Sequence, residues 1–270
     1  MTSSGNYRPS AAEPLLILAM DHRASFGRSL FGVRDDQPVP GQRAAMQAAK
    51  LLIYAGLVQA RRRLLGGRPG VLVDERYGQA VIDQARSDGT ILAVPVERSG
   101  RDWFELEWGR DWLEHVCSIR PEFAKVLIRD NPEFPAPQRE QQFGLLRQVS
   151  EALAEQGVPL LYELLVPATS GQLAEAGGTP GGYDRDIRPG LVIQVIADNQ
   201  AAGVEPAIWK VEGLETAEDD GFVGFAIGRS IWEDPISDHN QGRATEEQTI
   251  SRIAERYLDF ARQYLAARDA

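Results

Sequence analysis

The chain has 270 residues, of which 43% are hydrophobic and 25% are charged, and these proportions are typical of a folded globular protein. This length fits one large domain. The formal net charge of −10 argues against nucleic acid or an anionic membrane as the main partner, because binding to either requires a basic surface.

No segment has the composition of a membrane-spanning helix or of an export signal. Apolar runs such as residues 15–20 end far short of the roughly 20 residues that span a bilayer. Residues 1–14 are polar and rich in small side chains, so we expect a disordered tail before a single domain over residues 15–270. Cys117 is the only cysteine, which excludes an internal disulfide and a cysteine-based zinc site. A cytoplasmic location is therefore expected.

Seven short apolar segments, each bounded by turn residues, alternate with longer amphipathic segments. This alternation is typical of repeated βα units that form a parallel sheet. Each segment is apolar nearly throughout, as parallel strands are when they are buried on both faces. The predicted strands are residues 15–21, 70–75, 91–97, 123–129, 159–167, 207–213 and 222–232.

Amphipathic segments predict helices at residues 42–65, 78–87, 103–118, 137–156, 189–202 and 245–267. Thr245 and Gln248 are spaced as a capping box at the start of the last helix. The connections at residues 23–41 and 168–188 are long, and each follows the end of a strand, where a functional lid would lie. A disordered insertion is the alternative interpretation of both.

The order of elements predicts an α/β fold of the TIM type, built from β/α units around a barrel. A closed barrel of this type has eight strands, but only residues 214–221 separate the sixth predicted strand from the last. This connection is too short for a crossover helix. One βα unit is therefore missing at this point, or the last strand closes the barrel in another way.

Lysine is rare in this chain: Lys50, Lys125 and Lys210 stand beside 26 arginines. Arginine can fill any position that needs only positive charge, so the lysines are candidates for amine chemistry, which arginine cannot perform. Lys50 lies on a predicted surface helix and is expected to be incidental. Lys125 and Lys210 lie within predicted strands, where burial favours the neutral, nucleophilic amine that a Schiff base requires. A buried ion pair or a side chain that extends to solvent is the alternative.

Carboxylates lie close to these lysines in the predicted sheet. Strand alternation places Ile208, Lys210 and Glu212 on one face. Glu163 lies at the matching depth of the preceding strand, and Asp21 ends the first strand. Both carboxylates could transfer protons.

Glu75 and Glu97 also end predicted strands. They could belong to the same acidic ring, but we favour the interpretation that they are partners of Arg76 and Arg98.

Gly228, Arg229 and Ser230 follow the last strand, where barrels commonly bind phosphate through backbone N–H groups and a basic side chain. His22 adjoins Asp21 and could enter the site, whereas His115 and His239 are expected in a helix and a loop. A histidine-rich metal site is not expected. Magnesium held by carboxylates alone is a minor alternative.

Several motifs, in a specific order, resemble those of a known enzyme group. They are Met20-Asp21-His22-Arg23, Val73-Asp74-Glu75-Arg76-Tyr77-Gly78, Pro95-Val96-Glu97, Lys125-Val126-Leu127, Glu163-Leu164-Leu165-Val166-Pro167, Trp209-Lys210-Val211-Glu212-Gly213 and Gly224-Phe225-Ala226-Ile227-Gly228-Arg229-Ser230. In these motifs the chain resembles the aldolase domain of bacterial inositol catabolism, which acts on 2-deoxy-5-keto-gluconate 6-phosphate and can be fused to the matching sugar kinase. It is more distantly similar to class I tagatose-bisphosphate aldolases and to sulfofructose-phosphate aldolases.

The resemblance implies metal-independent retro-aldol cleavage of a phosphorylated keto sugar to dihydroxyacetone phosphate and malonate semialdehyde, with no cofactor. Lys210 matches the Schiff-base lysine of the family and Lys125 its second strand lysine, while Glu163 and Asp21 match its acid/base positions. Arg229 matches the arginine that binds the anionic end of the substrate. The full set expected to bind substrate is His22, Arg23, Glu75, Glu97, Glu212, Gly228, Arg229 and Ser230.

The chain departs from the family pattern at two places. His22 replaces the glutamine of the distant aldolases, and the missing strand would carry half of the phosphate site. Two alternatives therefore stay open: a catalytically silent domain that binds a sugar phosphate and supports a partner kinase, and a metal-dependent lyase. Self-association and association with a sugar kinase are both compatible with the sequence.

Overall fold

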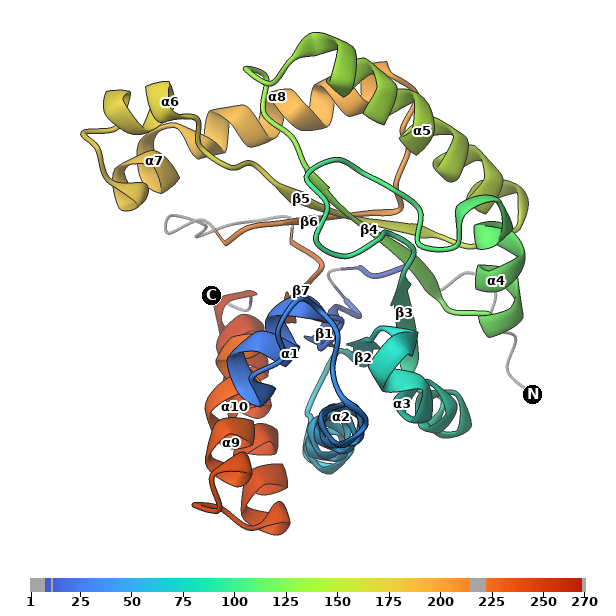
Figure 1. The fold of residues 1–270 in the computed structure, drawn as a ribbon, viewed down its shortest axis with the longest axis vertical. Helices are drawn as coiled ribbons and strands as arrows, with labels where there is room; N and C mark the ends of the chain where they lie inside the picture. Colours follow the sequence, from blue (N-terminus) through green and yellow to red (C-terminus); the bar gives the residue numbers. More distant parts are fainter. Residues whose placement is uncertain (1–7, 11, 214–221, 269–270) are drawn as a thin grey trace. The chain divides into compact units, whose positions relative to one another are not determined.

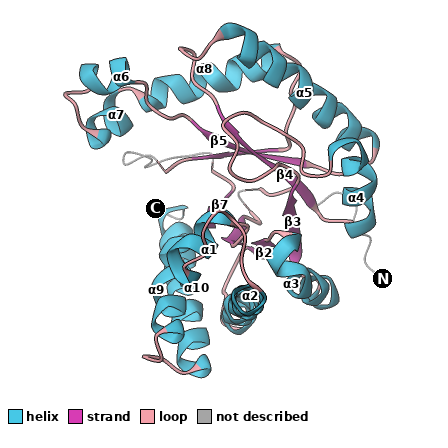
Figure 2. Cartoon of the chain, in the orientation of Figure 1, coloured by secondary structure: helices cyan, strands magenta, loops and turns pink. Residues whose placement is uncertain are grey.

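The computed structural model describes residues 8–10, 12–213 and 222–268. The fold is α/β of the TIM-barrel type, as predicted: seven parallel strands alternate with helices along the described chain (Figures 1 and 2). The chain forms two compact units, named here for their places in the sequence. Within the described residues, the central unit is residues 96–213, and the terminal unit is residues 8–95 with 222–268. Residues 1–7 and 11 of the predicted tail lie outside the described residues.

The sheet of the terminal unit contains four parallel strands in the order β3-β2-β1-β7. Its strands are β1 (Leu15–Ala19), β2 (Arg68–Leu72), β3 (Ile91–Pro95) and β7 (Gly224–Ile227). All residues of β1 and β3 are buried, which explains why both read as unbroken apolar runs in the sequence. Strands β1, β2 and β3 and the beginning of β7 therefore match the prediction.

Five helices belong to this unit: α1 (Ala24–Phe31), α2 (Pro40–Arg61), α3 (Glu75–Asp88), α9 (Arg229–Asn240) and α10 (Glu246–Arg268). Helix α10 packs against α2 and α9. The predicted capping box forms: the Thr245 amide donates to Gln248 Oε1 at 2.9 Å, and the Gln248 amide donates to Thr245 Oγ1 at 3.2 Å.

The prediction for the last strand was wrong at its carboxyl end. Strand β7 ends at Ile227, and residues 229–232 begin helix α9 after the N-cap Gly228. The apolar side chains beyond the strand are buried as parts of a helix, and Trp232 Nε1 donates to the carbonyl oxygen of Ala19 at 2.9 Å. The predicted long connection at residues 23–41 likewise contains a helix, α1.

The sheet of the central unit contains β4 (Phe123–Arg129), β5 (Leu160–Leu165) and β6 (Ile208–Val211) in the order β6-β5-β4. Helices α4 (Trp112–Ile119), α5 (Ala136–Glu155) and α8 (Arg188–Ala201) alternate with these strands. Buried side chains from β4, β5, α5 and α8 form one apolar core. The connection 214–221, where the missing βα unit was predicted, lies outside the described residues.

The helix predicted at residues 103–118 is only partly present. The short 3₁₀ helix η1 (Gly109–Asp111) and α4 cover its second half, while Leu106 forms an antiparallel bridge with Glu97. The Arg98 amide donates to the carbonyl oxygen of Glu105 at 2.8 Å, and the Phe104 amide donates to the buried Gln142 side chain at 3.0 Å, so bridge and side-chain contacts replace helical hydrogen bonds in this segment.

The predicted lid at residues 168–188 folds into two short helices, α6 (Ser170–Glu175) and α7 (Pro180–Asp186). Asn131 and Gln172 exchange side-chain hydrogen bonds at 2.8 and 3.1 Å. Tyr183 donates to the carbonyl oxygen of Val166, just after β5, at 2.7 Å. The segment is therefore an ordered part of the central unit, and the alternative of a disordered insertion was wrong.

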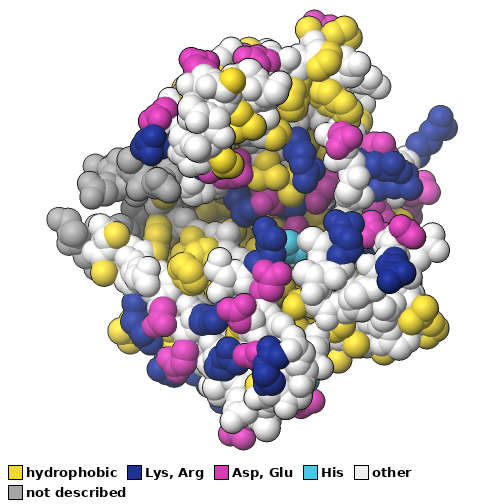
Figure 3. Space-filling view, turned by 60° about the vertical axis from the view of Figure 1, so that its left-hand side comes forward, with side chains coloured by type: hydrophobic (Ala, Val, Ile, Leu, Met, Phe, Trp, Pro, Cys, Tyr) yellow, Lys and Arg dark blue, Asp and Glu magenta, His cyan; other side chains and the backbone are white. Residues whose placement is uncertain are grey.

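No helix in the described ranges combines the length and the apolar character that crossing a bilayer would require. On the face shown in Figure 3, basic and acidic side chains are interspersed, as on the surface of an ordinary globular protein.

Candidate active site

Two lysines and two glutamates of the central unit form a chain of alternating charges. Lys125 Nζ lies 3.0 Å from Glu97 Oε1 and 3.0 Å from Glu163 Oε2. The other oxygen of Glu163, Oε1, accepts a hydrogen bond from Lys210 Nζ. Glu163 therefore binds both strand lysines at once, one through each oxygen.

The strand register explains why these side chains meet. Glu163 on β5 pairs directly with Lys210 on β6, which confirms the predicted match in depth. Lys125 on β4 pairs with Leu161, two residues before Glu163, so it points to the same face one layer deeper. Side chains on neighbouring parallel strands at this spacing can touch, and here they form the ion pairs just described.

The two lysines differ in exposure. The side chain of Lys125 is 0% exposed, whereas that of Lys210 is 21% exposed. Two carboxylates beside Lys125 favour its protonated form, because each stabilises a positive charge that burial would otherwise disfavour. Lys210 contacts Glu163 and is partly exposed, so it is the lysine that a substrate could reach.

Glu97 departs from the interpretation favoured by the sequence. It binds Lys125, whereas Arg98 lies 3.5 Å from Glu105. The expectation that Glu97 is simply a partner of Arg98 was therefore wrong. The cause is the bridge between Glu97 and Leu106, which directs the loop after Glu97 back along the chain and brings Glu105 to Arg98.

Glu212 joins the ends of β5 and β6. Its Oε2 accepts a hydrogen bond from the Val166 amide at 3.1 Å, and its Oε1 lies 3.2 Å from Arg188 Nη1. Arg188, at the start of α8, also donates to the carbonyl oxygen of Gly213 at 3.0 Å. Sequence reasoning missed Arg188, because nothing in its local pattern distinguishes it from the other arginines.

The remaining predicted residues lie in the terminal unit. Asp21, His22 and Arg23 follow β1, and His22 Nδ1 lies 3.9 Å from Asp21 Oδ1. The His22 ring meets Trp232 of α9 edge to face, with 5.4 Å between centroids. Glu75 is the first residue of α3. The segment after β1 is thus packed against α9.

Gly228 is the N-cap of α9, and Arg229 and Ser230 are the first, exposed residues of that helix. A Cβ atom at Gly228 would lie 2.6 Å from the carbonyl oxygen of Ala19, so a larger residue cannot occupy this position without a shift of β1. The close approach lets the helix begin directly after β7. The N–H groups at the start of a helix favour an anion. One of them, that of Ile231, donates to the carbonyl oxygen of Gly228 at 2.8 Å.

The structure corrects the prediction for Lys50. Its side chain is completely buried in α2, and its Nζ donates to the carbonyl oxygens of Met20 at 2.6 Å and His22 at 3.2 Å and to Asp74 Oδ2. Sequence periodicity assigned α2 correctly but placed Lys50 on its surface. The rarity of lysine, which made Lys125 and Lys210 candidates for a special role, was a signal that pointed to Lys50 as well.

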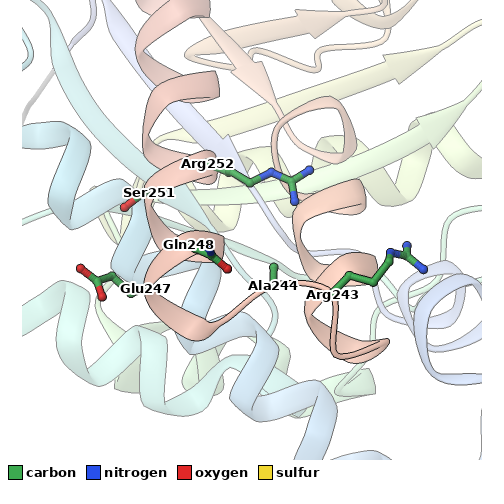
Figure 4. Close-up of a pocket in the computed structure, with 6 residues that line it drawn as sticks. All are labelled: Arg243, Ala244, Glu247, Gln248, Ser251 and Arg252. Carbon is green, nitrogen blue, oxygen red and sulfur yellow. The ribbon is translucent and has the colours of Figure 1, made fainter.

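A surface pocket between α9 and the start of α10 contains none of the predicted site residues. It is lined by Arg243, Ala244, Glu247, Gln248, Ser251 and Arg252 (Figure 4). Hydrogen bonds from Arg252 and Arg243 hold the pKa of Asp238 below its usual value. The two arginines are therefore occupied in stabilising the α9–α10 turn.

A family model described as "Uncharacterized protein conserved in bacteria (DUF2090)" covers residues 4–221. No curated protein matches the chain. Among solved structures, the chain is similar to Cgl0159 from Corynebacterium glutamicum, with a TM-score of 0.45, 16% identity and coverage of 93% of this chain and 88% of that chain. It is also similar to an archaeal fructose 1,6-bisphosphate aldolase, with a TM-score of 0.42, 13% identity and coverage of 92% and 95%. Since the family model covers most of its length, the chain belongs to the DUF2090 family.

Proposed function

We propose that the protein is a class I aldolase that forms a Schiff base on Lys210. The proposed substrate is 2-deoxy-5-keto-gluconate 6-phosphate, which would be cleaved to dihydroxyacetone phosphate and malonate semialdehyde. The observation that carries this proposal is the contact between the partly exposed Lys210 amine and Glu163. An amine beside a carboxylate can lose its proton to that carboxylate and then attack a carbonyl carbon.

The proposed reaction begins when the neutral Lys210 amine adds to the substrate ketone. Loss of water gives a protonated imine, which accepts electrons from the bond between the third and fourth carbons. As this bond breaks, the hydroxyl proton on the third carbon passes to Glu163 or Asp21, and malonate semialdehyde leaves. The remaining enamine takes a proton at carbon, and water hydrolyses the imine to release dihydroxyacetone phosphate and Lys210.

The contacts of Lys125 support different tasks for the two lysines. An ammonium group held between Glu97 and Glu163 is a poor nucleophile, because its lone pair is protonated. Its positive charge would keep Glu163 ionised, and only the ionised carboxylate can accept a proton. In this proposal Glu97 acts through Lys125, and Glu212 acts by fixing the ends of β5 and β6.

The proposed phosphate site is the start of α9. The Arg229 side chain is exposed there, and the helix N-terminus favours an anion. Gly228 and Ser230 would contribute backbone N–H groups and a hydroxyl. His22, Arg23 and Glu75 are proposed to contact the remainder of the sugar. A cytoplasmic location and association with a sugar kinase or a second copy are further parts of this proposal.

The test is a cleavage assay with 2-deoxy-5-keto-gluconate 6-phosphate, in which dihydroxyacetone phosphate is reduced by a coupled NADH-dependent dehydrogenase. The proposal predicts NADH consumption that survives treatment of the protein with EDTA. Loss of activity in EDTA, restored by a divalent cation, would favour the metal-dependent lyase. Binding of the sugar phosphate without cleavage would favour the silent binding domain.

A further inference from the structure

The buried ammonium group of Lys50 contacts the chain on both sides of Asp21. It donates to the carbonyl oxygen of Met20 at 2.6 Å and to that of His22 at 3.2 Å. Its third donor binds Asp74 Oδ2. An ammonium group has three N–H donors, so these contacts use all of them.

Asp74 ties this arrangement to a second strand end. Its other oxygen, Oδ1, accepts a hydrogen bond from the Tyr77 amide at 3.0 Å and thereby caps helix α3, which follows β2. Lys50 also lies over the ring of Phe26 in α1, 5.3 Å from its centroid. One side chain from α2 therefore joins the chain after β1, the start of α3 and helix α1.

Another cation would not fit this position. The Lys50 and Asp74 side chains are 0% and 1% exposed. A Cβ atom built at Gly78 would lie 3.6 Å from Lys50 Cδ, so the packing around the stem is already close. A guanidinium is larger and planar, with five N–H donors, and would require further acceptors in a site that is closed. These contacts account for a lysine at position 50 in a chain that has 26 arginines and three lysines.

We infer that Lys50 is a positioning residue, which fixes the backbone on either side of Asp21 and so sets the direction of the Asp21 and His22 side chains. This inference rests on the proposed function, in which Asp21 transfers protons. A carboxylate moved by about 1 Å can lose about a hundredfold in rate, because proton transfer depends strongly on geometry. Lys50 itself touches no substrate.

The test variant is Lys50→Met combined with Asp74→Asn, which removes both charges and keeps an oxygen to cap α3. The matched control is Tyr54→Phe. Tyr54 is also fully buried in α2, but its hydroxyl contacts Asp88 and Thr90, at the far end of α3 from Asp74. Both variants remove buried polar contacts of helix α2. Only Lys50→Met/Asp74→Asn removes contacts to the chain around Asp21.

The first measurement does not depend on catalysis. The chain has three histidines, so its imidazole proton NMR signals can be assigned by replacing each in turn. In the Lys50→Met/Asp74→Asn variant the His22 signals should shift or broaden, while those of His115 and His239 stay in place. Tyr54→Phe should leave all three unchanged. An unmoved His22 signal in the test variant would overturn the inference, even if the protein proves not to be an aldolase.

The second measurement separates positioning from stability. With the sugar phosphate as substrate, the test variant should lower kcat about ten- to a hundredfold and change KM by less than about twofold. Dihydroxyacetone phosphate and borohydride should still label Lys210 to the wild-type extent. Tyr54→Phe should lower Tm but leave kcat within about twofold. A loss of labelling that parallels the loss of kcat would contradict a role confined to Asp21.

The third measurement is a double-mutant cycle, which compares kcat of the test variant, of Asp21→Asn and of the two combined. If Lys50 acts through Asp21, adding Lys50→Met/Asp74→Asn to Asp21→Asn should lower kcat by no more than about a further twofold. If the falls in kcat of the separate variants multiply in the combined variant, as they do for independent sites, the inference is overturned.

If the test variant does not fold, Asp74→Asn alone keeps the cap of α3 and should still lower kcat about two- to tenfold. An unchanged kcat in Asp74→Asn would then contradict the inference. Absence of both cleavage and labelling in the wild type would refute the proposed function and leave the NMR result to decide the role of Lys50.

Discussion

Glu163 and Lys210 face each other on neighbouring parallel strands, and the lysine amine donates a hydrogen bond to the carboxylate. The same carboxylate binds Lys125, which is buried deeper in the sheet. A single side chain thus separates an accessible amine from a buried ammonium group. This separation is the physical basis for assigning nucleophilic chemistry to Lys210 and a supporting role to Lys125.

Replacing Glu163 by glutamine should remove proton transfer while nearly preserving shape. The amide cannot accept a proton from Lys210 or from the substrate hydroxyl, so kcat should fall by about 10²- to 10⁴-fold. Steady-state kinetics would measure this, with Glu140→Gln on the exposed side of α5 as the charge-matched control. A Glu163→Gln variant with near-wild-type kcat would exclude Glu163 as the acid/base group.

Replacing Lys125 by methionine should destabilise the protein. The change leaves Glu97 and Glu163 without the cation between them, and breaking a buried ion pair in this way costs about 3–5 kcal/mol. Urea denaturation would measure the loss. Adding Glu97→Gln should recover part of it, because one of the two carboxylates then needs no counter-ion. A loss below about 1 kcal/mol would show that the buried pairs contribute little.

Replacing Arg229 by alanine should weaken binding of phosphorylated ligands selectively. One arginine contact to phosphate contributes about 1.4–2.8 kcal/mol, which corresponds to a 10- to 100-fold higher Kd. Calorimetry with dihydroxyacetone phosphate would test this, with Arg63→Ala, which removes an exposed arginine paired with Glu255, as the control. Equal affinity in the Arg229→Ala and Arg63→Ala variants would refute the proposed phosphate site.

Alkaline pH should destabilise the protein through its buried tyrosines. Burial raises the pKa of Tyr183 to about 12, whereas an unfolded tyrosine ionises near about 10. Between these values the unfolded state loses the proton first, so the stability from Tyr183 is present below about pH 10 and is lost as pH rises towards 12. Urea denaturation at pH 9 and 11.5 should show a smaller fall for Tyr183→Phe than for the wild type. An equal fall in both proteins would contradict the role of Tyr183.

The strands could be predicted well from the sequence, because buried parallel strands are continuous apolar runs. Such runs can be recognised without knowledge of the tertiary fold. It also placed Glu163 level with Lys210, since parallel register follows from matching apolar segments. The start of α9 was missed because Ile231 and Trp232 extend the apolar run of β7, and only the cap at Gly228 reveals the change of period.

The role of Lys50 could not be read from its own segment. Helix α2 is buried on the faces that contact α3 and α10, so an amphipathic pattern gives no warning that a lysine lies inside. Its partners are backbone carbonyls after β1 and a carboxylate after β2, which are distant in sequence. The contact between Glu97 and Lys125 was missed for the same reason, because it depends on the path of the loop after residue 97.

Borohydride reduction with dihydroxyacetone phosphate, followed by intact-protein and peptide mass spectrometry, is the most direct test of the Schiff base. Addition of the Lys210 amine to the ketone with loss of water gives an imine, which borohydride converts to a stable secondary amine. A Schiff base on Lys210 should give one adduct, located on Lys210 and absent from the Lys210→Arg variant. An adduct on Lys125 or Lys50, or bound ligand without any adduct, would contradict the assignment of imine chemistry to Lys210.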